Sequence, residues 1–569
     1  MATIKSVAII GAGPAGAIAL DALAQEQAFD KIRLLERREK AGGCWLGDPK
    51  DHVQQLPDFE KIASRRADEP LPIPSELPAI LPHNTQYRFS DTSIYPTLET
   101  NIDAFAMSFS QEPFPETRSA VNIKRHGNDS PFRHWKVVEK YIQDLVDRRG
   151  YPDLISYDTT VELVHKDPHT SKWVLTLRKP LDSGIEDRWW TESFDAVVVA
   201  AGHYNVPFIP STPGLSTFSQ NFPGRVLHSK AWRDPEPYQG KRVVVVGASI
   251  SGPDISYALV DYVERPLHAV VRGRYHPYFF DYAFQHPNIL RRPPISHITS
   301  DPGTDERTVH FEDGSKLEKV DYIIFGTGYS WTLPFIPNLD STIRNNRLPN
   351  LYQHIFWRED PTLTFVGAVG AGFTFKVFEW QAVLAARFLA GRIILPSTEE
   401  QKKWEGDRIA LKGDGVQFTA LYPDFEEYFE TIREMAGEPK DGKGRSLPKF
   451  EKWWREGFDN GHLKRIDMWK RGNEEARRKI EGEKQTSIVS PVLRAGYCCA
   501  FKWFIFTHPR LPRPHLLTVF APLLHPVRLA RLARLARPVR LARRARLASF
   551  QETPEHFPHQ RQVARNHTK

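Results

Sequence analysis

Two short apolar runs each lead into a glycine-rich turn and then into a helical pattern. The first run, KSVAII at residues 5–10, enters GAGPAG at 11–16, and the second, VVVV at 243–246, enters GASISG at 247–252. An apolar run of this length is typical of a strand buried on both faces of a parallel sheet. Each stretch therefore predicts a strand, a tight turn and a helix whose N-terminus offers backbone N–H groups to a phosphate. The phosphate-facing positions are Gly11, Gly13, Pro14, Ala15, Gly16, Gly247, Ser249, Ser251 and Gly252.

The remaining apolar patterns alternate between helices and strands. Amphipathic patterns predict helices over 131–146 and 373–391. Apolar or alternating runs predict strands at 161–164, 173–177, 194–201, 321–325 and 363–369. This alternation predicts the α/β fold class, with two Rossmann-like dinucleotide-binding domains, and a charged stretch from residue 398 adds a C-terminal helical extension.

The two glycine-rich units differ at one comparable position. Glu36 lies 25 positions after Gly11, at the end of a predicted strand. Arg272 lies 25 positions after Gly247. An acid at this position accepts hydrogen bonds from free ribose hydroxyls, whereas an arginine suits a ribose 2′-phosphate. We therefore expect FAD in the first unit and NADPH in the second, and an arginine that lies on the surface by chance is the alternative.

A histidine motif precedes the second unit. Phe222, Gly224, His228 and Trp232 have the spacing F-x-G-x-x-x-H-x-x-x-W, which resembles the fingerprint of the flavin-containing monooxygenases, F-x-G-x-x-x-H-x-x-x-[YF]. The tryptophan is also similar to the Baeyer–Villiger monooxygenase variant, in which proline or aspartate follows it. Here Arg233 follows it. The resemblance thus indicates a class B flavin monooxygenase and leaves the branch open.

Other segments resemble the same family in the same order, over roughly residues 5–395. GGCW at 42–45 is similar to its flavin-side loop, LETN at 98–101 to its L-x-T-N segment, and GTGY at 326–329 to its return between domains. By itself Asn101 is a turn residue, but the family places this asparagine over the flavin at the oxygen site. The resemblance implies a catalytic role for Asn101 and no metal ligands. The implied cofactor contacts are Arg37, Gly43, Trp45, Thr100, Asn101, Ile102, His228, Lys230, Thr327, Gly328 and Tyr329.

The resemblance also implies an activity, similar to that of N,N-dimethylaniline monooxygenase. Such an enzyme uses NADPH and O2 to oxygenate a soft nucleophilic nitrogen or sulfur atom of a small organic molecule through a flavin hydroperoxide. Baeyer–Villiger oxygenation of a ketone, which Trp232 favours, is one alternative, and an NADPH oxidase that releases peroxide is another. A non-enzymatic surface-binding protein driven by C-terminal arginines is the third. The sequence identifies neither the substrate nor an oligomeric state.

The order of these segments predicts five regions. The FAD-binding domain takes up residues 1–206 and 320–397, and the NADPH-binding domain, 207–319, is inserted into it. A helical accessory segment follows at 398–485. The last region, 486–569, repeats arginine at every third position over part of its length, and we expect it to be a low-complexity, disordered basic tail.

Charge and cysteine content narrow the function classes. The chain has 569 residues and a net charge of +8, and removing the eight arginines between positions 528 and 546 leaves 69 basic against 69 acidic residues. The body therefore gives no reason to expect a nucleic-acid partner, although the tail permits weak association with an anionic membrane surface. Three cysteines and a strand pattern close to the N-terminus predict a reducing compartment and no secretory signal. We expect a cytoplasmic protein, or one peripheral to an intracellular membrane.

Overall fold

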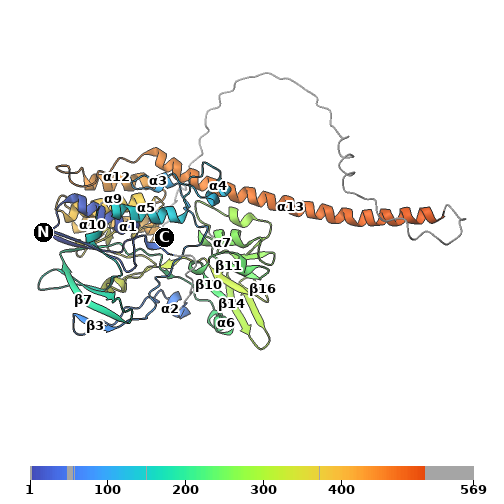
Figure 1. The fold of residues 1–569 in the computed structure, drawn as a ribbon, viewed down its shortest axis with the longest axis horizontal. Helices are drawn as coiled ribbons and strands as arrows, with labels where there is room; N and C mark the ends of the chain where they lie inside the picture. Colours follow the sequence, from blue (N-terminus) through green and yellow to red (C-terminus); the bar gives the residue numbers. More distant parts are fainter. Residues whose placement is uncertain are drawn as a thin grey trace, which may run out of the picture. The chain divides into compact units, whose positions relative to one another are not determined.

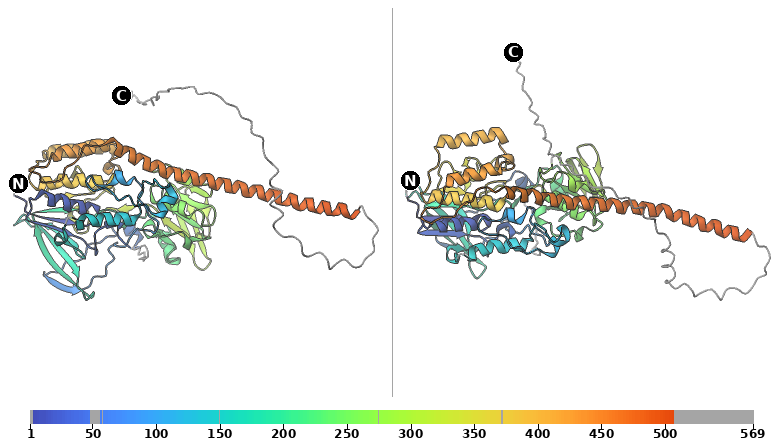
Figure 2. Two further views of the ribbon diagram at one scale, coloured as in Figure 1. Left: turned by 45° about the horizontal axis from the view of Figure 1, so that its top comes forward. Right: turned by 90° about the horizontal axis from the view of Figure 1, so that it is seen from above.

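Each glycine-rich turn follows a strand inside its own parallel sheet. The first sheet has the order β19-β20-β21-β8-β1-β2-β4, and the second has the order β10-β17-β11-β12-β13. The computed structural model describes residues 3–47, 56, 58–148, 150–273, 275–370 and 372–506, with one compact unit up to Gln485 and a second from Thr486. Within the first unit, the domain of the second sheet (green) lies beside the domain of the first (Figures 1 and 2).

Parallel pairing holds the centre of the first sheet together. β1 (Ser6–Ile10) pairs with β2 (Lys31–Leu35) on one side and with β8 (Ala196–Val199) on the other. β21 (Leu363–Phe365) continues the sheet beyond β8. β4 (Ile155–Ser156) forms one edge and β19 (Leu351–Tyr352) the other, and β20 (Phe356–Trp357) lies antiparallel between β19 and β21. Because β21, β8, β1 and β2 are parallel, their carboxyl ends lie at one edge of the sheet, together with the turn after β1.

Alternate side chains of β1 enter two different cores. Val7 and Ile9 face α1 (Pro14–Glu26), α5 (Trp135–Arg148) and α9 (Thr374–Leu389), whereas Ala8 and Ile10 face an antiparallel sheet. That sheet has the order β3 (Ala79–Pro82), β7 (Glu186–Phe194), β6 (Trp173–Pro180) and β5 (Thr160–Lys166). The parallel sheet is thus covered on both faces, which is why its strands are apolar throughout.

The second sheet repeats this pattern. β11 (Val243–Val246) pairs in parallel with β17 (Tyr322–Phe325) and β12 (Leu267–Val270), and β10 (Val226–His228) and β13 (Ile289–Arg292) form its edges. Val243 and Val245 share a core with α7 (Ser251–Leu259). Val244 faces the opposite core, which also contains side chains of α2 (Phe59–Ala63), α6 (Leu215–Asn221), β14 (Ile295–Asp301) and β15 (Glu306–Phe311).

One predicted domain boundary is wrong. We expected the NADPH-binding domain to end at residue 319 and the next strand to return to the first domain, but β17 lies between β10 and β11 of the second sheet. The chain instead crosses at β9 (Val206–Pro207) and β18 (Tyr329–Ser330), which pair antiparallel. An apolar run shows that a strand is buried but not which strands it pairs with. The second domain is a continuous insertion whose two connections lie side by side.

A buried arginine fixes the C-terminal helical segment to the first domain. The segment contains α10 (Thr398–Lys412), α11 (Val416–Thr419), α12 (Phe425–Ala436) and α13 (Lys452–Phe506). Between α12 and α13, the fully buried guanidinium of Arg445 pairs with Asp21 of α1 and with Glu379 of α9, at 2.7 Å from Glu379 Oε1. Glu112 Oε1 lies 3.5 Å from the same group. The segment is therefore part of the fold of this domain.

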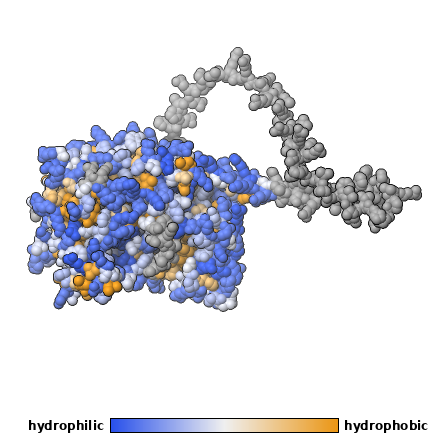
Figure 3. Space-filling model, viewed as in Figure 1, coloured by the Kyte–Doolittle hydropathy of each residue, from blue (hydrophilic) through white to orange (hydrophobic). Residues whose placement is uncertain are grey.

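The C-terminal region differs in part from what we expected. α13 extends to Phe506, so residues 486–506, which we expected to be disordered, are helical. The arginine repeat lies within 507–569, outside the described residues. None of the helices in the described part of the chain is long and apolar enough to cross a membrane. The face of the molecule shown in Figure 3 is largely hydrophilic, with small apolar patches.

Replacing Arg445 with methionine should destabilise the protein strongly. The change leaves Asp21, Glu112 and Glu379 in a buried site without their shared cation, which costs about 3–5 kcal/mol. Urea unfolding would measure the loss. The matched control is Lys403→Ala on α10, because Lys403 pairs with Asp407 through side chains that are 74% and 66% exposed, and it should change stability by less than about 1 kcal/mol. Equal stability of Arg445→Met and the parent would contradict the anchoring role.

Candidate cofactor-binding site

The first glycine-rich turn brings α1 into backbone contact with β1 and β8. A Cβ atom on Gly11, which has a φ of +97°, would lie 2.8 Å from the carbonyl oxygen of Ala200, and one on Gly16 would lie 1.7 Å from that of Gly11. Only glycine fits these positions without a shift of the backbone. α1 then begins at Pro14, and Gly13 gives it no side-chain cap. The N-terminus of α1 is therefore available to a phosphate at the carboxyl edge of the sheet.

Glu36 lies directly after β2, beside this turn. Its buried carboxylate accepts hydrogen bonds from the N–H of Ala12, at 2.6 Å, and from the N–H of Arg38, at 2.9 Å. A carboxylate has about four acceptor positions, so capacity remains for ribose hydroxyls. Glu36 thus fixes the turn and can also hold a ribose, as predicted from its place after the strand.

A cavity of about 200 Å³ lies along the same edge of the sheet. Its lining on the β2 side includes Glu36, Arg37, Arg38 and Thr159, and its lining on the β21 side includes Val366, Gly367, Phe375 and Phe378. The glycine-rich turn lies between them, because β1 lies between β2 and β8 in the sheet. The cavity therefore leads from a charged end, past a helix N-terminus, to an apolar end.

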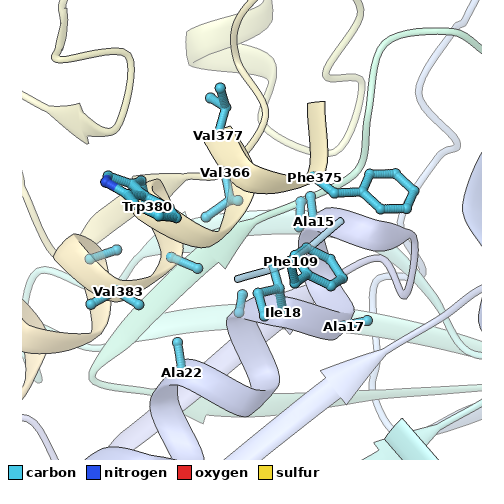
Figure 4. Close-up of a cluster of buried hydrophobic side chains, with 14 of the residues drawn as sticks. Ala15, Ala17, Ile18, Ala22, Phe109, Val366, Phe375, Val377, Trp380 and Val383 are labelled. Atoms are coloured by element: carbon cyan, nitrogen blue, oxygen red, sulfur yellow. The ribbon is translucent and has the colours of Figure 1, made fainter. Parts of the chain in front are cut away.

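This sequence of environments fits FAD, which carries an adenosine at one end, a pyrophosphate in the middle and the flavin ring system at the other. Ala15, Val366 and Phe375 gather where α1 meets α9 (Figure 4). Gly43 and Trp45 line the cavity as predicted. A Cβ atom on Gly43 would lie 2.7 Å from Gly13 Cα, so this loop also requires glycine. Arg38 fixes the loop by donating to the carbonyl oxygens of Gly43 and Leu46.

The second glycine-rich turn has the same geometry. A Cβ atom on Gly247 would lie 2.4 Å from the carbonyl oxygen of Gly326, and one on Gly252 would lie 2.0 Å from that of Gly247. Ser249 is exposed in the turn, and α7 begins at Ser251 without a side-chain cap. A second phosphate site at the N-terminus of α7 follows from the same argument.

Arg272 lies at the same end of its strand as Glu36, one residue further along, because Val271 is the first residue after β12. It follows β12, which pairs with β11 as β2 pairs with β1, and its side chain is exposed. The equal spacing of 25 positions therefore corresponds to places that differ by one residue in the two sheets. An exposed guanidinium at this edge is available to a 2′-phosphate.

The histidine motif joins the two domains. Burial lowers the pKa of His228 to about 3, so its ring is neutral. Because the carbonyl oxygen of Gly328, 2.9 Å away, can only accept, Nε2 of His228 carries the hydrogen, and Nδ1 accepts from the N–H of Lys230. The ammonium of Lys230 donates to the carbonyl oxygens of Phe89 and Asn205 and lies 3.1 Å from Asp91. Both side chains, which we expected at the cofactor, are engaged between the domains.

Thr327, Gly328 and Tyr329 also belong to this crossing. The hydroxyl of Thr327 donates to the carbonyl oxygen of Phe208. The N–H of Phe208 donates to the carbonyl oxygen of Gly328 at 2.9 Å. Arg65 donates to the carbonyl oxygen of Tyr329 and lies 3.6 Å from the centre of the Phe208 ring. The next residue, Ser330, and Val206 of the paired strand line the cavity, so the crossing borders the cofactor site.

The loop of Thr100, Asn101 and Ile102 lies outside the described lining of the cavity. Thr100 and Ile102 are buried, and Asn101 between them is half-buried. The N–H of Thr100 donates to the carbonyl oxygen of Arg133 at 2.9 Å, and the hydroxyl of Thr100 donates to the carbonyl oxygen of Ile102. The loop is thus held by hydrogen bonds of Thr100, directly before Asn101.

Several lining residues escaped prediction from the sequence. Asp68 and Arg88 come from a stretch without helical or strand periodicity, and Phe375 and Phe378 come from the helix predicted over 373–391, whose individual side chains were not singled out. His203 also lines the cavity, stacks on Trp331 at 4.5 Å and has its pKa lowered by burial to about 4. A signal for His203 was present in AAGHY at 200–204, which is similar to the A-T-G-H-Y segment of the flavin-containing monooxygenases.

A model of the flavin-binding monooxygenase-like family matches residues 84–275 and 296–438. The chain belongs to this family. FMO GS-OX3, a flavin-containing monooxygenase of Arabidopsis thaliana, is 30% identical over 478 residues, which cover 82% of this chain and 89% of that protein. Trimethylamine monooxygenase of Methylocella silvestris is 29% identical over 429 residues, 73% of this chain and 82% of that one. S-allyl-L-cysteine S-oxygenase from Allium sativum has a similar fold, with a TM-score of 0.62, 24% identity, and coverage of 84% of this chain and 99% of that one.

Membership of the flavin-binding monooxygenase-like family confirms three predictions. These are the family resemblance, the α/β fold with two dinucleotide-binding domains, and the cofactors FAD and NADPH. The residues that hold each cofactor remain predictions, supported by the geometry of the two turns.

Replacing Gly13 with valine should empty the flavin site. Gly13 lines the cavity at the N-terminus of α1, and a Cβ atom there would lie 3.4 Å from Gly43 Cα, so the branched side chain would fill the space of the phosphates. We expect at least about a tenfold loss of FAD affinity, measured as flavin absorbance per protein. Gly406→Val in α10 is the control, because nothing lies within 4 Å of a Cβ there. Normal flavin content in a folded Gly13→Val protein would overturn the assignment.

Proposed function

We propose that this protein is an NADPH- and O2-dependent monooxygenase that oxygenates a soft nucleophilic nitrogen or sulfur atom of a small organic molecule. One observation carries the proposal: two parallel sheets in one compact unit place an acid and an arginine at comparable ends of β2 and β12. This pair supports one nucleotide with free ribose hydroxyls and one with a 2′-phosphate. The name of the relative trimethylamine monooxygenase, which specifies an amine, supports a nitrogen substrate.

The residues of the first domain bind and orient the flavin. Glu36 is placed for the ribose hydroxyls, and the N-terminus of α1 is placed for the pyrophosphate. Val366, Phe375 and Phe378 provide apolar contacts at the far end of the cavity. When bound, FAD supplies the redox chemistry by accepting hydride from NADPH and activating O2. The protein contributes position, charge and exclusion of water.

Asn101 is the residue that we assign to the oxygen half-reaction. Its carboxamide provides both a donor and an acceptor, and it does not titrate near neutral pH. A carboxylate at this position could not donate once ionised, and an aliphatic side chain could do neither. The loop fixes both neighbours of Asn101, so its side chain can donate a hydrogen bond to an oxygen atom, or accept one from an N–H group, in a defined place.

The deciding experiment is an assay of the purified, yellow protein with NADPH, O2 and a panel of tertiary amines, thioethers and ketones. The proposal requires an oxygenated amine or thioether formed in proportion to the NADPH consumed. Ketone oxygenation without amine or thioether products would show Baeyer–Villiger activity. NADPH consumption that yields only peroxide with every compound would show an oxidase.

Replacing Arg272 with alanine should reduce the preference for NADPH over NADH. A charge-assisted hydrogen bond contributes about 1.5–3 kcal/mol, so we expect roughly a tenfold or greater loss of NADPH affinity and little change for NADH. Initial rates with both coenzymes would measure this. Lys316→Ala in the same domain is the control, because Lys316 is 59% exposed and pairs with Glu318. An unchanged preference would exclude Arg272 from coenzyme recognition.

Replacing Asn101 with alanine should separate flavin reduction from oxygenation. The variant should retain FAD and oxidise NADPH, because the two glycine-rich turns hold the nucleotides and Asn101 is one contact among many. It should lose most of its product, with the electrons recovered as hydrogen peroxide. A peroxide assay beside product quantification would measure the ratio. The same ratio in the variant and the parent would remove Asn101 from the mechanism.

A further inference from the structure

α13 contacts both nucleotide-binding domains within the first compact unit (Figure 2). Near its start, Trp454 and Phe458 are buried in the core of the first domain. Further along, Trp469 packs 5.5 Å from Phe279, which belongs to the second domain. Asn473 then donates to the carbonyl oxygen of Tyr282 at 2.8 Å. One helix therefore connects the two domains at a distance from the crossing strands.

α13 carries a glycine where it passes the Asn101 loop. A Cβ atom on Gly461 would lie 2.9 Å from the backbone nitrogen of Asp103 and 3.5 Å from the carbonyl carbon of Ile102. One turn earlier, a Cβ atom on Gly457 would lie 3.6 Å from that of Ala106. Glycine inside a helix costs about 1 kcal/mol relative to alanine. At Gly461 the absence of a side chain lets the backbone of α13 contact the residues that follow Asn101.

One turn after Gly461, Arg465 reaches the second nucleotide site. Its guanidinium lies 2.5 Å from Asp254, which is in the first turn of α7, and its side chain is only 8% exposed. Phe279 and Trp469 lie beside the guanidinium at 5.8 and 5.5 Å. A buried ion pair adds little net stability compared with well-packed apolar residues. Its better-supported use is to fix the register of two elements, here α13 and α7.

The other side of the Asn101 loop is fixed independently. Glu99 is buried and accepts from Asn122 at 2.5 Å, while His126 Nε2 lies 2.7 Å from its other oxygen. Arg125 lies 3.4 Å from the same carboxylate. The loop is therefore attached to α4 (Ala120–His126) before Asn101 and to α13 after it.

We propose that the turn of α13 from Gly461 to Arg465 sets the position of the Asn101 loop relative to the NADPH helix α7, and that Arg465 is a positioning residue for oxygenation. The proposal rests on the proposed function and adds a determinant that lies outside both glycine-rich turns. If α13 shifts, the bound coenzyme and Asn101 change their separation, although each site remains intact. Breaking this turn should therefore lower NADP⁺ affinity and increase peroxide release, without emptying the flavin site.

The test compares Arg465→Met and Arg465→Lys with Arg478→Met, a control on the same helix whose side chain is 79% exposed. A second pair compares Gly461→Ala with Gly482→Ala, where nothing lies within 4 Å of the added Cβ. For each flavin-loaded protein, the measurements are the NADP⁺ dissociation constant, KM for NADPH against kcat, the peroxide fraction, and hydrogen exchange of the amides from Ile102 to Met107.

We expect Arg465→Met and Gly461→Ala to keep their flavin, to bind NADP⁺ about fivefold or more weakly, to release more peroxide and to exchange the 102–107 amides faster. Arg465→Lys should restore part of each property, and the controls should match the parent. Parental NADP⁺ affinity, peroxide fraction and amide exchange in flavin-loaded Arg465→Met and Gly461→Ala would overturn the proposal. Losses of NADP⁺ affinity and of coupling that only parallel a loss of bound flavin would also overturn the proposal. If the parent oxygenates nothing, the proposed function fails, while NADP⁺ affinity and amide exchange still decide the role of α13.

Discussion

The distance between a helix and the strand before it is the constraint on which both nucleotide sites depend. In each domain the last glycine of the turn, which lies inside the helix, faces the carbonyl oxygen of the first glycine, at 1.7 Å for a Cβ on Gly16 and 2.0 Å for one on Gly252. With any larger residue the helix would move outward and its N-terminus would leave the carboxyl edge of the sheet. The cavity, the orientation of Glu36 and the place of Arg272 all follow from this contact.

The family fingerprint has a second role beside nucleotide binding. His228 and Lys230 are engaged with Gly328, Phe89, Asn205 and Asp91, so they fix the inserted domain to the first domain at the crossing strands. Buried polar groups in such a network must be satisfied together, because an unpaired donor costs about 1–3 kcal/mol. Trp232 is likewise buried, 4.8 Å from Tyr95, so its packing explains the aromatic position without reference to a ketone substrate.

Local patterns in the sequence were enough to predict the two turns, the strands that enter them and the helix at the apolar end of the cavity. The spacing from the first glycine placed Glu36 directly after β2, but the same spacing placed Arg272 one residue beyond the equivalent position, because Gly247 bonds to Val270 where Gly11 bonds to Leu35. The sheet to which β17 belongs could not be predicted, since pairing is a property of two segments. Asp68, Arg88 and Arg445 were also missed, because each is brought to its place by contacts that no periodicity records.

The insertion of the second domain has a consequence for the order in which the chain folds during synthesis. The first sheet needs β21 and its helical layer needs α9, and both are made long after β1 and α1. All strands of the second sheet lie between β10 and β17, so that domain can close while the first is still incomplete. Domains generally fold as units as they leave the ribosome. The inserted domain would then be finished before its host, and the flavin could be enclosed only after α9 had been translated.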